Sequence, residues 1–291
     1  MRRLSWIVLL ALPFVLPDAS AQQNRPRRAP IELGPDDKPA VPAAPEGFDA
    51  RRDDVPRGKI ETVEYDSSTV GVKRKMRVYT PPGYDEKAPY PVLYLLHGIG
   101  GDEEEWERGG KVGVVMDNLL ADKLATPMIV VMPNGRAQPN DRAEGDVFRH
   151  AKAFETFEGD LLKDVIPFIE KTYAVRKDRE GRALAGLSMG GGQSLNFGLG
   201  HPDVFAWVGG FSSAPNTRPP DKLVTNPEEA AKLRLLWISC GDKDGLINIS
   251  QRTHGYLKEK NVPHVWHVEP GGHDFAVWKD DLYHFAQRLF R

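Results

Sequence analysis

One stretch of the chain decides its fold: Arg182-Ala183-Leu184-Ala185-Gly186-Leu187-Ser188-Met189-Gly190-Gly191-Gly192. The apolar residues before Ser188 indicate a strand, and the residues after it indicate a helix that begins at once. Gly186 and Gly190 flank Ser188 in the pattern G-x-S-x-G, a strained turn that lifts a nucleophilic serine hydroxyl clear of a sheet. Glycine suits both flanking positions because a Cβ there would collide with neighbouring backbone. The alternative interpretation is a plain glycine-rich turn, so the rest of the chain must supply the other parts of a site.

Size and composition are those of an ordinary globular protein. The chain has 291 residues, a formal net charge of −2 and 40% hydrophobic residues, which suits one large α/β domain or two small ones. A charge near zero gives no reason to expect nucleic acid or an anionic membrane as a partner. The single cysteine, Cys240, excludes an intramolecular disulfide and ends an apolar run, where we expect a buried structural thiol.

The N-terminus has the composition of a secretory signal peptide. A basic start is followed by an apolar run of 11 residues from Trp6 to Leu16 and by the small-x-small site Ala19-Ser20-Ala21. These features predict a signal peptide over residues 1–21, cleaved after Ala21, and a secreted or periplasmic protein with no membrane anchor, because the run is too short to cross a bilayer. Residues 22–57 contain seven prolines and are predicted to be a disordered linker, which leaves a folded domain over residues 58–291.

Strand patterns and helical periodicity alternate along the predicted domain. Two alternating segments before residue 80 predict an antiparallel hairpin, and later continuous apolar runs predict buried central strands. The predicted strands cover residues 60–65, 73–79, 90–96, 128–132, 183–187, 207–211, 235–240 and 265–268, and the predicted helices cover residues 154–173, 189–199, 249–260 and 274–289. This order favours the α/β class, with a mainly parallel, doubly wound sheet and an N-terminal antiparallel hairpin.

Partners for Ser188 are expected at the carboxyl ends of the strands, in the chain order Ser, Asp, His. His273 is the predicted base, because it follows the last strand in a glycine-rich loop that can reach back to the elbow. Two aspartates, Asp242 and Asp244, follow the strand at 235–240. Spacing favours Asp244 as the acid that orients His273. Asp242 remains the alternative, although it could instead close the turn by a side-chain hydrogen bond.

An oxyanion hole requires two backbone N–H groups beside the serine. Met189 offers one at the start of the helix after the elbow, where the helix dipole favours negative charge. The glycine-rich turn after another buried strand contains Ile99, which is the predicted second donor. His97 is expected to brace this turn by a hydrogen bond and to take no part in the chemistry. No metal-ligand spacing is visible, and the predicted reaction requires neither a metal nor a cofactor.

Three motifs carry a family resemblance: Tyr79-Thr80-Pro81-Pro82-Gly83-Tyr84, Tyr90-Pro91-Val92-Leu93-Tyr94-Leu95-Leu96-His97-Gly98-Ile99-Gly100-Gly101 and Gly186-Leu187-Ser188-Met189-Gly190-Gly191. Through them the chain resembles the esterase D-type family of esterases, which have the α/β-hydrolase fold. Residues 240–256 and 271–279 are similar to the feruloyl esterase domains attached to some bacterial xylanases (carbohydrate esterase family 1). In those domains the catalytic aspartate ends a G-x-x-D turn, so the resemblance implies Asp244 rather than Asp242. It also implies hydrolysis of esters on plant cell-wall polysaccharide.

We therefore expect a secreted serine esterase that acts through Ser188, His273 and Asp244 and forms an acyl-enzyme. Its expected partners are small-molecule or polysaccharide esters, in particular feruloyl or acetyl esters of plant cell-wall polysaccharide. An acyltransferase or a siderophore-type esterase on the same fold is the alternative, and a catalytically silent binding protein is the alternative of another class. The long polar loops at 136–151 and 212–232 are the candidate walls of the substrate pocket.

Overall fold

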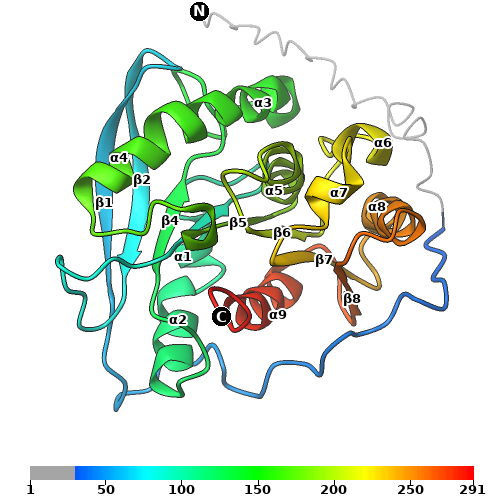
Figure 1. The fold of residues 1–291 in the computed structure, drawn as a ribbon, viewed down its shortest axis with the longest axis horizontal. Helices are drawn as coiled ribbons and strands as arrows, with labels where there is room; N and C mark the ends of the chain where they lie inside the picture. The colour runs from blue at the N-terminus through cyan, green and yellow to red at the C-terminus, as the bar shows by residue number, and fades with distance from the viewer. Residues whose placement is uncertain (1–29) are drawn as a thin grey trace, which may run out of the picture. The chain divides into compact units, whose positions relative to one another are not determined.

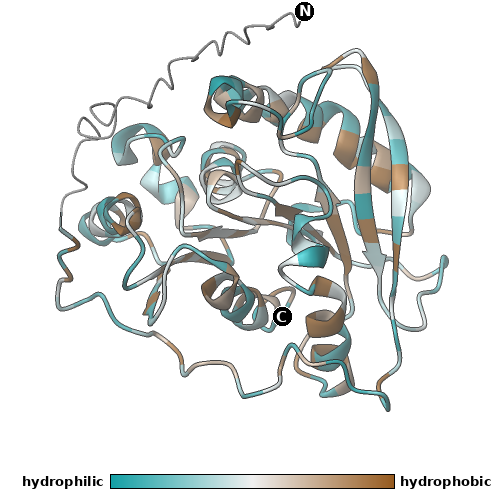
Figure 2. Ribbon diagram, turned by 180° about the vertical axis from the view of Figure 1, so that it is seen from behind, coloured by the Kyte–Doolittle hydropathy of each residue, from teal (hydrophilic) through white to brown (hydrophobic). Residues whose placement is uncertain are grey.

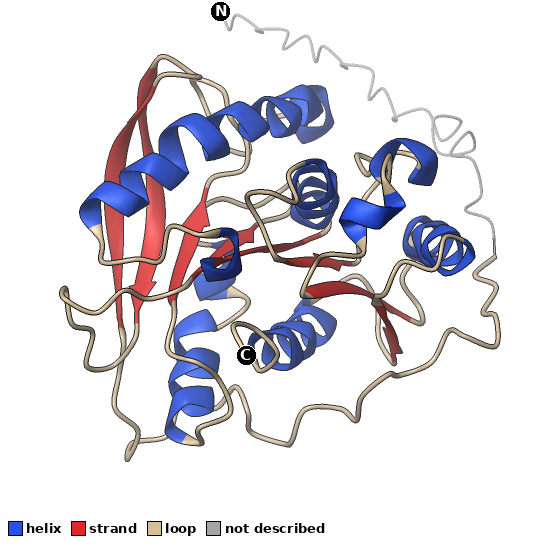
Figure 3. Ribbon diagram, viewed as in Figure 1, coloured by secondary structure: helices blue, strands red, loops and turns tan. Residues whose placement is uncertain are grey.

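A single sheet of eight strands runs through the protein, whose computed structural model describes residues 30–291 (Figure 1, Figure 3). The strand order is β1-β2-β4-β3-β5-β6-β7-β8, and only the pairs β1–β2 and β2–β4 are antiparallel. The bounds are β1 Lys59–Ser67, β2 Val72–Thr80, β3 Val92–Leu96, β4 Ile129–Pro133, β5 Arg182–Leu187, β6 Trp207–Phe211, β7 Leu235–Gly241 and β8 Val265–Glu269. The predicted mainly parallel sheet with an N-terminal hairpin is confirmed.

Helices cover both faces of the sheet (Figure 1). One face carries α3 (Ala151–Asp160), α4 (Ile166–Thr172), α5 (Met189–Gly200) and α8 (Ile247–Glu259), and the other carries α2 (Val112–Ala121) and α9 (Phe275–Ala286). A π-helical turn, Leu161–Val165, joins α3 to α4, which explains why the sequence shows one long periodic segment there. Short helices complete the chain: α1 Glu105–Arg108, α6 Pro220–Leu223 and α7 Pro227–Ala230.

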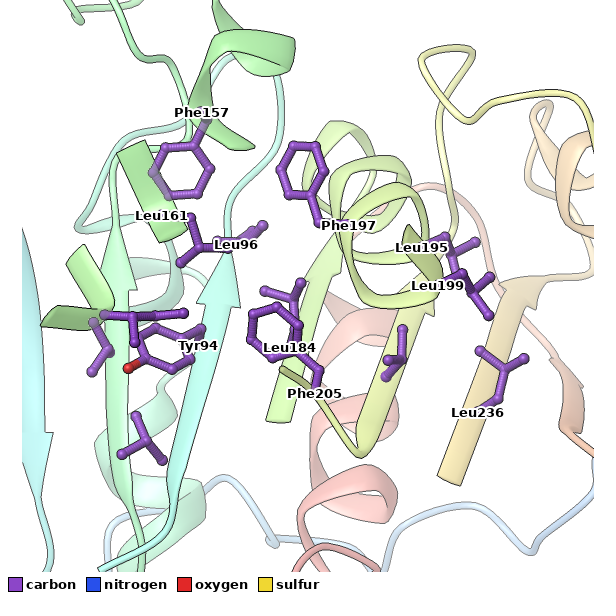
Figure 4. Close-up of a cluster of buried hydrophobic side chains, with 14 of the residues drawn as sticks. Tyr94, Leu96, Phe157, Leu161, Leu184, Leu195, Phe197, Leu199, Phe205 and Leu236 are labelled. Carbon is purple, nitrogen blue, oxygen red and sulfur yellow. The ribbon is translucent and has the colours of Figure 1, made fainter. Parts of the chain in front are cut away.

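The core has two layers because successive strand residues point to opposite faces of the sheet. Leu93 and Leu95 of β3 pack toward α2 and α9, whereas Tyr94 and Leu96 pack into the layer beneath α3 and α5 that Figure 4 shows. Each large apolar side chain buried in this way contributes roughly 1.5–3 kcal/mol. The outer hairpin instead alternates hydrophilic and hydrophobic residues, as Figure 2 shows, because it buries one face only. Cys240 lies in the core, where burial raises the pKa of its thiol, as expected of a structural cysteine.

Residues 31–57 form an extended strap along the domain, coloured blue in Figure 1. The Lys38 carbonyl accepts a hydrogen bond from the N–H of Val268 on the edge strand β8 (3.1 Å), and Asn118 of α2 donates to the Phe48 and Ala50 carbonyls (2.9 Å each). The compact unit that contains the sheet therefore begins at Ile31. The sequence pattern predicts a folded domain that begins only at residue 58. Prolines prevent regular structure here, but they leave an extended backbone that covers an open sheet edge.

The predicted signal peptide, residues 1–21, and the first part of the predicted linker, residues 22–29, lie outside the described residues. Within residues 30–291, no helix combines the length and the apolar character needed to cross a membrane.

Candidate active site

Ser188 occupies the sharp turn between β5 and α5. Its φ of 52° and ψ of −116° lie in a region that residues with a side chain rarely adopt. A Cβ on Gly190 would lie 2.5 Å from the Leu96 carbonyl oxygen, and a Cβ on Gly186 would lie 2.6 Å from the Gly190 carbonyl carbon. Only glycine fits at both places, so the G-x-S-x-G pattern has the steric cause that such an elbow requires.

His273 reaches the elbow from the loop between β8 and α9. Its Nε2 lies 2.9 Å from Ser188 Oγ. The ring meets the indole of Trp278 edge to face, with centroids 5.0 Å apart and an interplanar angle of 89°. The next residue, Asp274, caps α9 by accepting a hydrogen bond from the Ala276 N–H (2.8 Å). The helix start and the indole together hold the imidazole against the serine hydroxyl.

Asp244 lies on the other side of the imidazole, in the loop after β7. Its Oδ2 is 2.7 Å from His273 Nδ1, and its Oδ1 accepts a hydrogen bond from the Leu246 N–H at 2.8 Å. The side chain is fully buried. Burial opposes ionisation of this carboxyl, but the hydrogen bonds from His273 and Leu246 outweigh it and hold the pKa of Asp244 below its usual value. The residue is therefore a carboxylate aimed at the imidazole Nδ1–H.

Asp242, the competing candidate, has a different partner. Its Oδ1 accepts a hydrogen bond from the Gly271 N–H (2.9 Å), and its own N–H donates to the Glu269 carbonyl (2.8 Å). Asp242 thus ties the loop after β7 to the loop that carries His273. Of the two aspartates, Asp244 is the one that contacts the imidazole.

The two predicted oxyanion donors lie in one neighbourhood, since the side chains of Ile99 and Met189 share a small apolar cluster. A Cβ on Gly98 would lie 2.9 Å from Leu187 Cδ1 and 3.5 Å from the Ser188 Cβ, so the glycine lets the turn approach the serine closely. The Ile99 N–H donates to no acceptor within residues 30–291, and it is free to bind a ligand oxygen.

Three polar side chains hold the turn that contains Ile99. His97 Nδ1 lies 2.6 Å from the Gly98 carbonyl oxygen, Glu105 accepts the Gly98 N–H at 2.7 Å, and the Arg136 guanidinium donates to the Ile99 carbonyl. Burial lowers the pKa of His97, so its ring is neutral and acts as the expected brace. The roles of Glu105 and Arg136 were not predicted from the sequence. No local sequence pattern distinguishes a charged side chain that turns into the protein from one that points to solvent.

A small apolar cluster lies beside the serine, whose carbonyl accepts a hydrogen bond from the Ala214 N–H (3.0 Å). It consists of Phe154, Met189 and Ala214, with Ile99, Ala151 and Leu246 packed against them. The candidate wall loops 136–151 and 212–232 each contribute to it, through Ala151 and Ala214. A cavity of about 360 Å³ lies next to this cluster and shares Phe154 with it; its lining is Phe154, Glu155, Glu158, Gln193, Asn196, Phe197, Asn216 and Arg218. Asn216 joins the two regions by donating to the Met189 carbonyl (2.9 Å).

The site thus combines a strained serine, an imidazole, a buried carboxylate and backbone donors. Comparison with known proteins relates the chain to one family. Residues 67–289 match the family described as "Putative esterase". The chain belongs to this esterase family. It is 34% identical over 257 residues to the endo-1,4-beta-xylanase/feruloyl esterase of Xylanibacter ruminicola, with 86% of this chain and 34% of that relative covered. This family member therefore spans about a third of the length of that relative.

Solved structures of related esterases have the same fold. A ferulic acid esterase of Anaeromyces mucronatus superposes with a TM-score of 0.76 and 27% identity over 85% of this chain and 96% of that one, and another structure of that enzyme contains ferulic acid. The feruloyl esterase module of Clostridium thermocellum superposes with a TM-score of 0.72 at 18% identity over 89% of this chain and 97% of that one, a likeness of fold alone. The predicted α/β-hydrolase fold and the predicted family are confirmed.

Proposed function

We propose that this esterase-family member is a serine carboxylic ester hydrolase that acts through Ser188, His273 and Asp244. The observation that carries the proposal is the unbroken hydrogen-bonded line from the serine Oγ through the imidazole to the buried carboxylate, with distances of 2.9 and 2.7 Å. A serine alone is a weak nucleophile, and this arrangement is the means by which a neighbouring base activates it.

The chemistry follows from the protonation of the imidazole. The carboxylate of Asp244 accepts at Nδ1, so the neutral ring keeps its proton there and Nε2 has a free lone pair. As Ser188 Oγ attacks the ester carbonyl, Nε2 takes the hydroxyl proton, and the buried carboxylate stabilises the imidazolium. The N–H groups of Ile99 and Met189 bind the oxyanion of the tetrahedral intermediate.

Collapse of that intermediate expels the alcohol, which takes the proton back from Nε2, and leaves the acyl group on Ser188. A water molecule then attacks the acyl-enzyme, giving its proton to the same nitrogen, and the carboxylic acid leaves as the serine is restored. Every step uses groups of this chain and water only.

The substrates in this proposal are feruloyl or acetyl esters of plant cell-wall polysaccharide. Three observations support it: the name of the Xylanibacter relative, the ferulic acid bound by the Anaeromyces enzyme, and a match of 22% identity to an acetyl esterase of Caldicellulosiruptor saccharolyticus. The apolar cluster of Phe154, Met189 and Ala214 lies beside Ser188, the residue that would carry the acyl chain or ring. The adjoining polar cavity suits a hydroxylated alcohol. The proposed site of action is outside the cytoplasm, reached through the signal peptide over residues 1–21.

A fluorophosphonate probe tests the mechanism. The wild-type protein should be labelled at Ser188, as located by peptide mass spectrometry, and Ser188→Ala should not be labelled. Folded wild-type protein that neither reacts with the probe nor hydrolyses p-nitrophenyl acetate would contradict the proposal and favour a silent binding protein.

Rates on methyl ferulate, acetylated xylan and p-nitrophenyl acetate then rank the acyl groups. Product analysis with an added sugar acceptor separates hydrolysis from acyl transfer. A mature N-terminus at Gln22 in the exported protein would support the proposed cleavage.

A further inference from the structure

A second group of titratable side chains lies between the last strand and the last helix, apart from Ser188. His267 and Glu269 are two residues apart on β8 and share one side of the sheet. Asp280 and His284 are four residues apart on α9 and share one side of the helix. All four are buried, with exposed fractions of 1%, 8%, 6% and 7%. The topology thus brings two imidazoles and two carboxyls into one interior cluster.

The inner atoms of this cluster face one another. One ligand atom from each of His267, Glu269 and Asp280 lies within 4.8 Å of the other two. His267 Nε2 is 3.7 Å from Glu269 Oε1, and His284 Nε2 is 3.2 Å from Asp280 Oδ1. None of these four atoms has a hydrogen-bond partner within the part of the chain that the structure describes. Native interiors pair their buried polar atoms, so three such atoms within 4.8 Å of one another, with His284 Nε2 beside Asp280, indicate an occupant.

The strap holds the outer atoms of the same side chains. The Ala40 N–H donates to His267 Nδ1 at 3.0 Å, and the Ala44 N–H donates to Asp280 Oδ2 at 2.7 Å. These two bonds hold the His267 ring and the Asp280 carboxyl from outside and leave Nε2 and Oδ1 directed inward. The Ala44 bond can persist when a cation binds to Oδ1, whereas the Ala40 bond belongs to the cluster without a cation.

The carboxyls of this cluster are left to imidazole partners, which are themselves metal ligands. Among the described residues, the ion-pair partners of Glu269 and Asp280 are histidines, and no lysine or arginine nitrogen lies within 4.0 Å of either carboxyl. Without a cation, burial and the neighbouring carboxyls raise the pKa of Glu269 to about 10, so its carboxyl is protonated and loses that proton when a cation binds. A divalent ion would replace the proton and give the inner atoms of His267, Glu269 and Asp280 a partner.

We propose that His267, Glu269 and Asp280 bind one divalent cation of the zinc class, with His284 as the fourth ligand. A tetrahedral site with bonds of about 2.1 Å places its ligand atoms about 3.4 Å apart. The two short separations in the cluster, 3.2 Å from His284 to Asp280 and 3.7 Å from His267 to Glu269, bracket that value, and the atoms of His267, Glu269 and Asp280 all lie within 4.8 Å of one another. Mixed imidazole and carboxylate ligands suit Zn²⁺ and disfavour Mg²⁺ and Ca²⁺, which take oxygen ligands.

Cation binding changes one contact of the strap. Because His267 Nδ1 accepts the Ala40 N–H, the neutral ring without a cation carries its proton on Nε2. A cation on Nε2 requires that proton to leave, and the neutral ring then carries one on Nδ1. Ala40 loses its acceptor, whereas Ala44 keeps Asp280 Oδ2 because Asp280 meets the cation through Oδ1. The cation thus stabilises the domain and frees the strap at Ala40.

Calorimetric titration of untagged, chelator-treated protein with ZnCl₂ tests the proposal, with MgCl₂ as the comparison ion. We expect one Zn²⁺ per chain, no comparable Mg²⁺ binding, and a Tm raised by about 5 °C or more at a hundredfold excess over Kd. The isosteric changes Glu269→Gln and Asp280→Asn should each weaken binding at least about tenfold. His264→Gln is the matched control, because His264 forms a separate pair with His254, 2.8 Å between ring nitrogens.

The results of these experiments distinguish a cation in this cluster from water there and from a cation at the His254–His264 pair. Absence of Zn²⁺ binding by the wild type would overturn the proposal and leave water in the cluster. Binding lost in His264→Gln but kept in Glu269→Gln would overturn it in favour of the His254–His264 pair. Hydrogen exchange at the Ala40 amide should become faster with Zn²⁺, and unchanged exchange would exclude ligation through His267 Nε2. If the variants fail to fold, X-ray absorption of the wild-type complex decides, since the proposal requires imidazole and carboxylate ligands and no sulfur.

Discussion

Replacement of Asp244 by asparagine tests whether Asp244 supports catalysis by orienting the His273 imidazole or only by filling space beside it. The two side chains have nearly the same shape, so the buried loop after β7 should keep its fold. What changes is the hydrogen-bonding character of the atom that meets His273 Nδ1. In the wild type that atom is a carboxylate oxygen at 2.7 Å.

The neighbouring contact decides which way the new amide turns. The Leu246 N–H donates to Asp244 Oδ1 at 2.8 Å, so in Asp244→Asn it selects the amide oxygen and leaves the NH₂ facing His273. Nδ1 must then accept, Nε2 carries the proton, and Ser188 has no base. The loss in kcat should approach about 10,000-fold, or about 5.5 kcal/mol of transition-state stabilisation.

Asp242→Asn is the matched control, since it lies in the same turn with the same change of chemistry. Among residues 30–291, its side chain accepts a hydrogen bond only from the Gly271 N–H, a role that an amide oxygen also fills, so kcat should fall by less than about tenfold. Initial rates with p-nitrophenyl acetate, with folding checked by circular dichroism, measure both variants. Equal losses, or a larger loss in Asp242→Asn, would refute the assignment of Asp244.

Three further predictions concern the scaffold. Gly186→Ala should yield little folded protein, because its Cβ would lie within 2.8 Å of three backbone atoms, whereas Gly100→Ala, with nothing within 4 Å, should match the wild type in soluble yield. A chain beginning at residue 58 should have a lower Tm than one beginning at residue 31, because it uncovers the edge of β8; equal Tm values would contradict a docked strap. Arg74→Met should lower the free energy of unfolding in urea by about 3–5 kcal/mol, since it leaves the buried Asp160 without its cationic partner, and a loss below about 1 kcal/mol would count against that ion pair.

Features with a local steric cause were predictable from the sequence. The elbow is the clearest case, because Gly186 and Gly190 are required by atoms within four residues or on the adjacent strand. The buried strands were predictable for a similar reason, since a strand covered on both faces must be apolar throughout. The choice between Asp242 and Asp244 was harder. Both follow β7 in one turn, and they differ only in partners about 29 residues away.

Features that depend on distant partners were not predictable. The strap has a proline-rich composition that argues against a core, yet β8 and α2 supply its hydrogen bonds. Helix α2 was missed because it begins after Lys111 in a left-handed conformation without a side-chain cap, and its first residues are β-branched or glycine. The cluster of His267, Glu269 and Asp280 was not predicted, because its residues come from two elements, β8 and α9. Within each element, their spacing is that of ordinary core or surface residues.

The G-x-x-D turn also has a physical explanation that joins the scaffold to the site. A Cβ on Gly241 would lie 2.5 Å from the Gly271 carbonyl oxygen, so only glycine allows the loops after β7 and β8 to cross at this point. The crossing is held by hydrogen bonds from Lys243 N–H to that same carbonyl (2.8 Å) and from Gly271 N–H to Asp242. Asp244 and His273 follow this crossing by three and two residues, too few for the chains to diverge. The glycine that opens the turn is therefore a reason why the aspartate that ends it meets the imidazole.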